Sequence, residues 1–181
     1  MKFTALDIPG LVVVEPDVHV DNRGFFFESY NKEIFAQNGV DVQFVQDNHS
    51  KSSKGVLRGL HFQVPPYAQD KLIRVTKGKV LDVAVDIRRS SSTYGKWVSV
   101  ELDEDNKKML FIPKGFAHGF LCLSEVVEFE YKVSGYYNAE NSHGIMWNDP
   151  DLAIEWPVQD PVLSEKDKGN FKFKDLPEFF E

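Results

Sequence analysis

Apolar and polar residues alternate along many short segments of this chain, which is the pattern of β-strands with one buried face. The clearest example is 80–87, where one face carries Leu81, Val83, Val85 and Ile87 and the other carries both aspartates. A period of two fits a strand and does not fit a helix. Many short strands predict a sandwich or a barrel. The predicted strands are 11–14, 24–28, 42–48, 56–62, 71–75, 80–87, 96–101, 108–112, 118–123 and 126–133.

Helical segments are few and short. Residues 32–38 predict one helix, because Asn31 can cap its first turn and Gly39 can adopt the left-handed conformation that ends it. After Tyr136 the composition shifts toward Asn, Asp, Pro and Trp, which predicts a loop-rich tail that wraps the barrel. Ser164 is placed to cap a brief helical turn in that tail.

Size and charge exclude several classes of function. The 181 residues fit a single domain, for which we expect 1–181 with a barrel core at about 40–135. A net charge of -7 argues against general binding to nucleic acid or anionic membrane. Neither a signal peptide nor an apolar stretch of about 20 residues is present. The single cysteine, Cys122, lies in an apolar run, which favours a buried, inert thiol and a cytoplasmic protein.

Two stretches carry candidate chemistry: GVLRGLHFQ at 55–63, followed by Lys71, and IPKGFAH at 112–118. They resemble the two signature stretches of the cupin superfamily. That resemblance implies an all-β protein, a jelly-roll β-barrel with its site inside and a few short peripheral helices.

The metal ligands of this superfamily are not all in place. Metal-binding cupins present two histidines one residue apart, then a glutamate, then a third histidine. Here Gln63 stands at the second histidine and Lys71 at the glutamate. An amide is a poor ligand and a protonated lysine has no lone pair, so only His61 and His118 remain. We therefore expect no metal cofactor, and Lys71 instead supplies a positive charge inside the barrel.

Seven separated motifs identify a closer resemblance. They are DNRGFFFE (21–28), QDNHS (46–50), GVLRGLH (55–61), IPKGFAHGF (112–120), YK with YY (131–132, 136–137), WNDP (147–150) and LSEKD (163–167). In these motifs and in their order, the chain resembles the dTDP-4-dehydrorhamnose 3,5-epimerase family over nearly its whole length. The resemblance implies the substrate dTDP-4-dehydro-6-deoxy-glucose, inversion at C3 and C5, and a role in rhamnose biosynthesis. It also implies a homodimer with exchanged N-terminal strands and no cofactor.

The resemblance assigns four catalytic residues. His61 is the base, and Asp167 orients its ring and stabilises the imidazolium. Lys71 stabilises the negative charge on the C4 oxygen, and Tyr131 returns a proton from the opposite face. Alternation over 127–133 places Tyr131 on the apolar face, which points its phenol into the barrel.

The family pattern implies further residues that bind the substrate. Arg23 and Arg58 are expected on the diphosphate, because a guanidinium group matches two phosphate oxygens. Tyr137 and Phe26 are expected to stack on the thymine. The other implied substrate contacts are Glu28, Gln46, Asp47, Asn48, His118 and Lys166.

Two positions require comment. Strict alternation puts Arg58 and His61 on opposite faces of a strand, so either a bulge near Gly59 or a partner subunit must reconcile them. Ser142 stands where many relatives carry a glutamate, which removes one implied substrate contact.

Several of the predicted site residues can instead have a purely structural role. His118 can be a structural histidine, Tyr131 a core residue and Asp167 a solvated charge. Asp82 and Asp86 can face inward or lie on the surface. Three other functions also compete: an epimerase of a single carbon on the same scaffold, a metal-dependent cupin enzyme, and a sugar-nucleotide binding module without catalysis.

Overall fold

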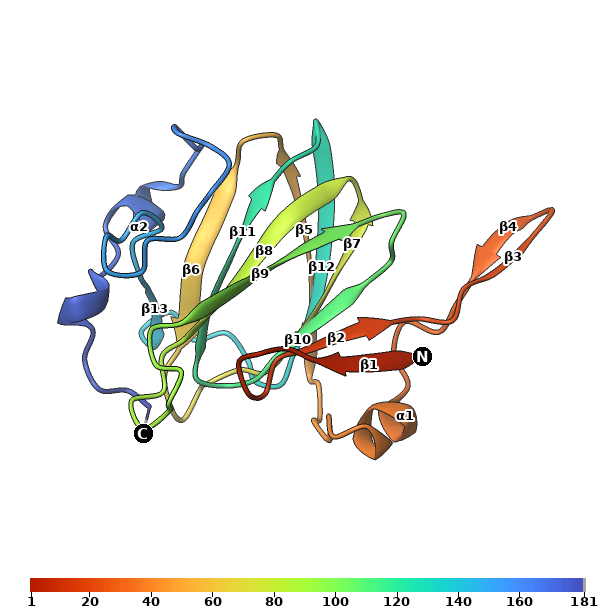
Figure 1. Ribbon diagram of the computed structural model, residues 1–181, viewed down its shortest axis with the longest axis horizontal. Coiled ribbons are helices and arrows are strands. Elements are labelled where there is room, and N and C mark those ends of the chain that lie inside the picture. Colours follow the sequence, from red (N-terminus) through yellow and green to blue (C-terminus); the bar gives the residue numbers. More distant parts are fainter. Residues whose placement is uncertain (181) are drawn as a thin grey trace.

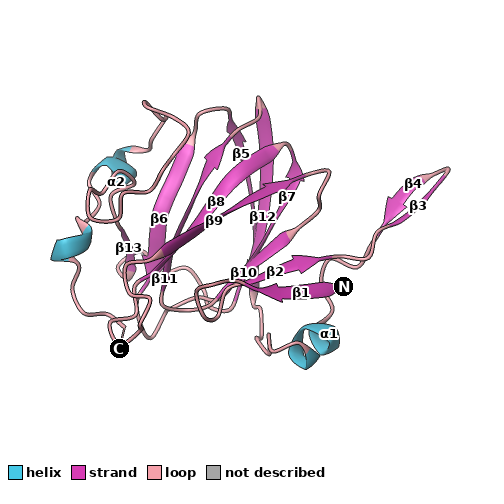
Figure 2. Ribbon diagram, viewed as in Figure 1, coloured by secondary structure: helices cyan, strands magenta, loops and turns pink. Residues whose placement is uncertain are grey.

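Two facing antiparallel sheets form a barrel in the computed structural model, which describes residues 1–180 (Figures 1 and 2). One sheet has six strands in the order β1-β2-β10-β7-β12-β5, and the other has five in the order β13-β6-β11-β8-β9. The all-β prediction is confirmed. The strands are β1 (Lys2–Ala5), β2 (Val12–Glu15), β3 (His19–Asp21), β4 (Gly24–Phe26), β5 (Gln46–Ser53), β6 (Leu57–Gln63), β7 (Lys71–Lys77), β8 (Lys79–Asp86), β9 (Trp97–Asp103), β10 (Met109–Ile112), β11 (Phe116–Cys122), β12 (Val126–Val133) and β13 (Ser142–Gly144).

Apolar side chains from both sheets pack together inside the barrel. Ile73 and Phe129 come from the six-stranded sheet, and Val80 and Phe120 come from the five-stranded sheet. The Phe120 and Phe129 rings stack with their centroids 3.9 Å apart. This aromatic contact joins the two sheets beneath the cavity described below.

Both faces of β8 are buried, and its two aspartates point into the barrel. Asp82 and Asp86 are completely buried, on the same side as Val80 and Ala84 of the interior cluster. The opposite face, which includes Val83, packs under the C-terminal segment. The alternation therefore predicted correctly which residues of β8 share a face. The apolar face packs against the C-terminal tail, so the face that carries the aspartates lies inside the barrel.

Short helices lie at the edge of the barrel. Helix α1 (Lys32–Gln37) begins at Asn31, whose side chain accepts hydrogen bonds from two backbone amides, and Gly39 has a φ of 86° after its last turn, as predicted. Phe35 of α1 packs on the outer face of the six-stranded sheet. The tail contains α2 (Glu165–Lys168), capped by Ser164 as predicted, and the 3-10 turn η1 (Phe173–Asp175). No helix in residues 1–180 is long and apolar enough to cross a membrane.

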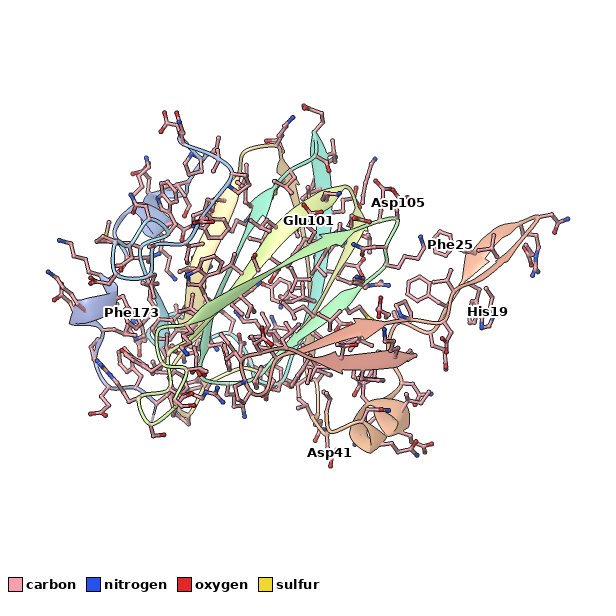
Figure 3. All side chains as sticks on the ribbon, viewed as in Figure 1. His19, Phe25, Asp41, Glu101, Asp105 and Phe173 are labelled. Atoms are coloured by element: carbon pink, nitrogen blue, oxygen red, sulfur yellow. The ribbon has the colours of Figure 1, made fainter. Side chains whose placement is uncertain are left out.

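The hairpin β3–β4 projects away from the barrel (Figures 1 and 3). His19 and Phe25, both labelled in Figure 3, lie on this arm. Val20 is 77% exposed and Phe26 is 68% exposed. Large apolar side chains at this exposure cost free energy in water, so the arm has the character of an interaction surface.

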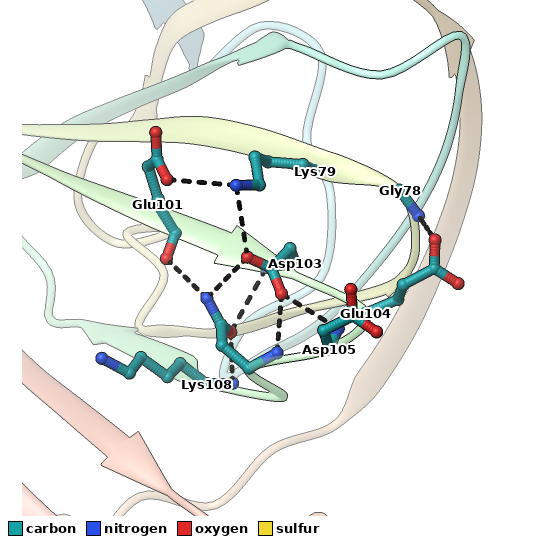
Figure 4. Close-up of polar contacts among 8 residues, drawn as sticks. Gly78, Lys79, Glu101, Asp103, Glu104, Asp105 and Lys108 are labelled. Carbon is teal, nitrogen blue, oxygen red and sulfur yellow. Dashed lines mark hydrogen bonds and ion pairs between the residues drawn. The ribbon is translucent and has the colours of Figure 1, made fainter.

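The turn between β9 and β10 is fixed by polar contacts (Figure 4). Asp103 accepts hydrogen bonds from the backbone amides of Asp105 and Asn106 at 2.9 and 2.6 Å. Glu104 accepts a bond of 2.9 Å from the Gly78 amide, which ties this turn to the adjacent turn between β7 and β8. The network stabilises one end of the barrel.

Several strand boundaries differ from the predictions. The strand predicted at 42–48 lies at Gln46–Ser53, because Val42 and Phe44 pack against α1 instead of joining the sheet. Strands β1, β3 and β13 were not predicted, since they are three or four residues long and lack a full apolar alternation. The loop-rich tail after Tyr136 is confirmed.

Candidate active site

A cavity of about 490 Å³ opens between the two sheets. Its wall is formed mainly by β6, β7, β11 and β12, together with the tail around α2. Eight of the fourteen site residues predicted from sequence line it: Arg58, His61, Lys71, His118, Tyr131, Tyr137, Lys166 and Asp167.

His61 and Asp167 form a hydrogen-bonded pair in this cavity. His61 Nε2 contacts Asp167 Oδ1, and Asp167 is buried within the four-residue tail helix α2. Burial alone raises the pKa of the Asp167 carboxyl, but the hydrogen bond and charge of His61, with donors from Ser164 and Gly59, hold that pKa below its ordinary value. Asp167 is therefore an anion that faces the imidazole, and not a solvated surface charge.

A bulge in β6 brings Arg58 and His61 to the same cavity. His61 pairs with His118 of β11 and Arg58 pairs with Phe120, so three steps along β6 match two steps along β11. The extra residue lies at Gly59, which has a φ of 135° and approaches β11 so closely that a Cβ there would lie 2.5 Å from a backbone atom. Of the two alternatives that the sequence left open, a bulge near Gly59 or a partner subunit, the structure shows the bulge.

His118 is held by a second aspartate. Its Nε2 lies 3.0 Å from each carboxylate oxygen of Asp82, and both residues are buried. Burial lowers the pKa of His118, and the positive charges of Lys71 and His61 lower it further, against the opposing effect of Asp82. His118 is therefore a neutral imidazole at neutral pH, with Nε2–H directed at Asp82.

Lys71 is the buried cation of the site. Its Nζ lies 3.4 Å from the backbone oxygen of His61. Burial lowers the pKa of Lys71 to about 8, and the charge of Asp82 opposes that fall. Since this value lies above 7, most molecules carry the ammonium form at neutral pH.

Tyr131 faces the cavity from β12, across the barrel from His61. It packs against the interior cluster that contains Val127 and Phe129, as the alternation predicted. Burial raises the pKa of its phenol, and the charge of Arg58 only partly offsets this. The phenol is therefore protonated at neutral pH.

Two cations at the cavity wall have no carboxylate partner among residues 1–180. Arg58 donates to Ser52 Oγ at 3.1 Å and to the Lys51 backbone oxygen at 3.4 Å. Lys166 Nζ donates to Ser142 Oγ at 3.2 Å. Neutral partners leave both positive charges uncompensated, so this part of the wall attracts an anionic ligand.

The side chain of Gln63 forms hydrogen bonds to backbone groups. Its amide nitrogen donates to the oxygens of Tyr67 and Tyr136 at 2.8 and 3.1 Å, and its amide oxygen accepts from the Asn138 amide at 2.7 Å. Two of these bonds fix the loop before β13 and the third fixes the loop between β6 and β7, so this side chain has a structural role at the position of a cupin metal ligand.

The other six predicted site residues do not line the cavity of their own chain. Gln46 and Asn48 share a face of β5 with the cavity residue Ser50 and bond to each other at 2.8 Å. Asp47 points to the outer surface, where it pairs with Lys132. The remaining three, Arg23, Phe26 and Glu28, lie on or beside the projecting arm.

Two kinds of residue in the site were not assigned from sequence. The sequence does not decide whether Asp82 faces inward or outward; the available signal is its place between Val80 and Ala84 on an alternating strand. Ser50 and Gln69 also line the cavity, and as ordinary polar residues they carried no signal.

Comparisons with known proteins agree with this geometry. The sequence model of the dTDP-4-dehydrorhamnose 3,5-epimerase family matches residues 5–175. The dTDP-4-dehydrorhamnose 3,5-epimerase of Shigella flexneri is 54% identical over 99% of each chain, and that of Methanothermobacter thermautotrophicus is 48% identical over 93% of this chain and 92% of its own.

Solved structures give the same result for the fold. The Legionella pneumophila epimerase in complex with dTDP-4-keto-L-rhamnose superposes with a TM-score of 0.93, at 45% identity, covering 97% of this chain and 94% of its own. A 3'-monoepimerase from Streptomyces bikiniensis in complex with dTDP-quinovose has a TM-score of 0.89 at 34% identity, covering 93% and 86%. The cupin-type barrel expected from the two signature stretches is thereby confirmed. The chain belongs to the dTDP-4-dehydrorhamnose 3,5-epimerase family.

Proposed function

We propose that this chain epimerises its dTDP-sugar with His61 as base, Lys71 as the group that stabilises the enolate and Tyr131 as acid. The activity is that of an isomerase, converting dTDP-4-dehydro-6-deoxy-glucose into dTDP-4-dehydrorhamnose. The observation that carries the mechanism is that His61 and Tyr131 line one cavity from opposite sheets. Inversion requires a base and an acid on opposite faces of the sugar carbon.

Proton removal is assigned to the nitrogen of His61 that is free of Asp167. If Nε2–H donates to the carboxylate, Nδ1 carries the lone pair that accepts the proton from C3 or C5. The imidazolium formed in this step is stabilised by the buried Asp167 anion. The pair thus serves both to orient the ring and to hold the charge that develops on it.

The electrons released from the C–H bond move to the C4 oxygen. A neutral imidazole is a weak base for a carbon acid, so the reaction depends on stabilising this oxygen as its charge forms. Lys71 is the buried ammonium group in the cavity and supports that role by its charge and burial. Neutral His118, whose Nε2–H is directed at Asp82, is proposed as a substrate contact beside it.

The acid is proposed to be the phenol of Tyr131. Its raised pKa keeps the proton available until the enolate forms, and its strand lies across the barrel from β6. Transfer of that proton to the carbon from the face opposite His61 inverts the centre. The phenolate recovers its proton from solvent, and His61 releases its own.

The nucleotide is proposed to bind along the uncompensated cations. Arg58 and Lys166 are available for the diphosphate, because neither forms an ion pair within residues 1–180. Tyr137 lines the cavity and is 62% exposed, which suits a ring that stacks on thymine. Gln46 and Asn48 extend from the same wall toward sugar or base hydroxyl and carbonyl groups.

A homodimer is proposed to complete the site. Arg23, Phe26 and Glu28 are predicted substrate contacts, yet their arm projects away from its own barrel. An arm that crosses to a neighbour would deliver them to the partner's cavity and would cover the exposed Val20 and Phe26. A cytoplasmic location is proposed as well, from the single cysteine and the nucleotide-sugar substrate.

Solvent deuterium uptake tests the reaction. Conversion in D2O should place label at both C3 and C5 of the product, detected by NMR, because each centre receives its new proton from a solvent-exchanged donor. Label at a single carbon would instead establish the epimerase of one carbon, the activity of the Streptomyces bikiniensis relative. Turnover that persists after exhaustive chelation would separate both from a metal-dependent cupin enzyme.

A further inference from the structure

The two buried aspartates of β8 have very different partners. Asp86 accepts hydrogen bonds from Arg88, Ser91 and Thr93, so a cation and two hydroxyl groups satisfy it. Asp82 is equally buried, yet within residues 1–180 its carboxylate is hydrogen bonded only to the ring of His118. A buried carboxylate without a hydrogen-bonded cation is costly in free energy, so a positive charge elsewhere is needed to offset that of Asp82.

The charged groups around Lys71 identify the two members of this charge pair. The titratable or charged groups that line the cavity beside Lys71 are His61 and Arg58 from β6, His118 from β11, Tyr131 from β12, Tyr137, and Lys166 with Asp167 from α2. Asp82 from β8 lies behind His118, bonded to its ring. Only two of these are carboxylates. Asp167 is already paired with His61, which leaves Asp82 as the anion available to balance the Lys71 ammonium.

We propose that Asp82 is the buried counter-ion that keeps Lys71 protonated inside the barrel. It acts through space, and through the ring of His118, without touching the substrate, so it is a positioning residue and not a catalytic one. The inference rests on the proposed role of Lys71 in stabilising the enolate.

The charge balance supports this assignment. Burial lowers the pKa of Lys71 to about 8, and the negative charge of Asp82 opposes that fall. Burial also lowers the pKa of His118, so the imidazole is neutral and leaves the charge of Asp82 uncancelled. Geometry places the two groups close together, because Lys71 Nζ lies 3.4 Å from the backbone oxygen of His61, and His61 is the register partner of His118, whose ring bonds Asp82. The buried Asp82 anion therefore offsets the charge of the buried Lys71 ammonium group.

The test is Asp82→Asn, which removes the charge and preserves the shape and the contact with His118. NMR titration of the lysine Nζ signals in the folded protein should show the Lys71 midpoint falling by about one unit or more. The alkaline limb of the kcat profile should move to lower pH by the same amount, giving about a tenfold loss at high pH, while KM stays within about twofold. Unmoved Lys71 midpoint and kcat limb would overturn the proposal.

Asp86→Asn is the matched control, because it removes a buried aspartate from the same face of the same strand. It should lower stability without moving the Lys71 midpoint. A shift of equal size in both variants would overturn the specific role of Asp82.

A reciprocal variant covers the case in which Asp82→Asn does not fold. Lys71→Met removes the ammonium group, and the pKa of His118, followed by its ring NMR signals, should rise because Lys71 lowers it. No rise would overturn the proposal. If the Lys71 midpoint moves in Asp82→Asn but the kcat limb does not follow, the counter-ion is established and the enolate role of Lys71 is the part that fails.

Discussion

His61 Nε2 is in hydrogen-bond contact with Asp167 Oδ1, although 106 residues separate the two in sequence. The imidazole comes from the barrel wall and the carboxylate from the tail that wraps it. Packing of the tail against the barrel therefore completes the proposed base. A carboxylate on Nε2 fixes the tautomer and leaves Nδ1 as the basic atom.

Replacing His61 with asparagine should abolish turnover and leave the nucleotide site intact. We expect kcat to fall by about 10²- to 10⁴-fold, because the base is removed while Arg58 and Lys166 are untouched. The Kd of dTDP, measured by calorimetry, should change by less than about threefold. Turnover that survives the substitution would refute the assignment of the base.

Replacing Tyr131 with phenylalanine should uncouple exchange from inversion. His61 can still remove a proton and return one to the same face, so the substrate recovered from D2O should carry deuterium without inversion. Product formation should fall by about 10²-fold or more. The measurement is NMR of both recovered substrate and product, and rapid inversion in this variant would exclude the phenol as the acid.

The strand pattern predicted which side chains share a face, but not always which face is inside. Tyr131 was placed correctly because only one face of β12 is apolar. For β8 both faces are buried, and the C-terminal tail decides that Asp82 faces inward. That decision depends on contacts between segments about 70 to 100 residues apart, which periodicity does not encode.

Site residues of the tail and the arm were predicted from their motifs alone. Asp167 lies in a four-residue helix where charges are ordinary, and no local signal directs it to His61. Arg23 and Phe26 lie on or beside a hairpin that projects from the barrel, and nothing in its strand pattern specifies what the hairpin contacts. A bulge at Gly59 was one of the two alternatives that the sequence offered, because two predicted site residues three positions apart had to reach one cavity.

Replacing Arg58 with alanine should weaken nucleotide binding more than chemistry. Loss of hydrogen bonds to a charged phosphate corresponds to an increase of about 10- to 100-fold in the Kd of dTDP. We expect a similar rise in KM and a smaller change in kcat, measured by steady-state kinetics at fixed ionic strength. Lys166→Met should raise the Kd of dTDP in the same way. An unchanged Kd in both variants would contradict the placement of the diphosphate.

The lowered pKa of Asp86 predicts that the protein loses part of its free energy of unfolding in acid. Burial alone would raise its pKa, but hydrogen bonds from Arg88, Thr93 and Ser91 lower it to about 2 from 3.8. A lowered pKa stabilises the fold above the unfolded value, and this contribution of about 2 kcal/mol disappears as pH falls through the folded value. Asp86→Asn should thus be less stable at neutral pH, and urea titrations should show the gap narrowing below about pH 4. A gap that is constant with pH would contradict the shift.

The proposed homodimer with crossed arms predicts that two inactive variants complement each other. His61→Asn lacks the base, and a variant carrying both Arg23→Ala and Phe26→Ala lacks the arm contacts. When the two are expressed together, a mixed dimer has one barrel with an intact base that receives an intact arm from its partner. Half of the dimers are mixed at equal expression and each has one complete site, so activity should recover to about a quarter of the native level.

The control pairs His61→Asn with Tyr131→Phe. Both changes lie in the barrel, so no arrangement of arms yields a complete site and the mixture should stay inactive. If each arm served its own barrel, the first mixture would stay inactive as well, because every subunit would then lack either a base or an arm. Recovery in the first mixture alone therefore distinguishes a shared site from a dimer that merely packs two complete ones.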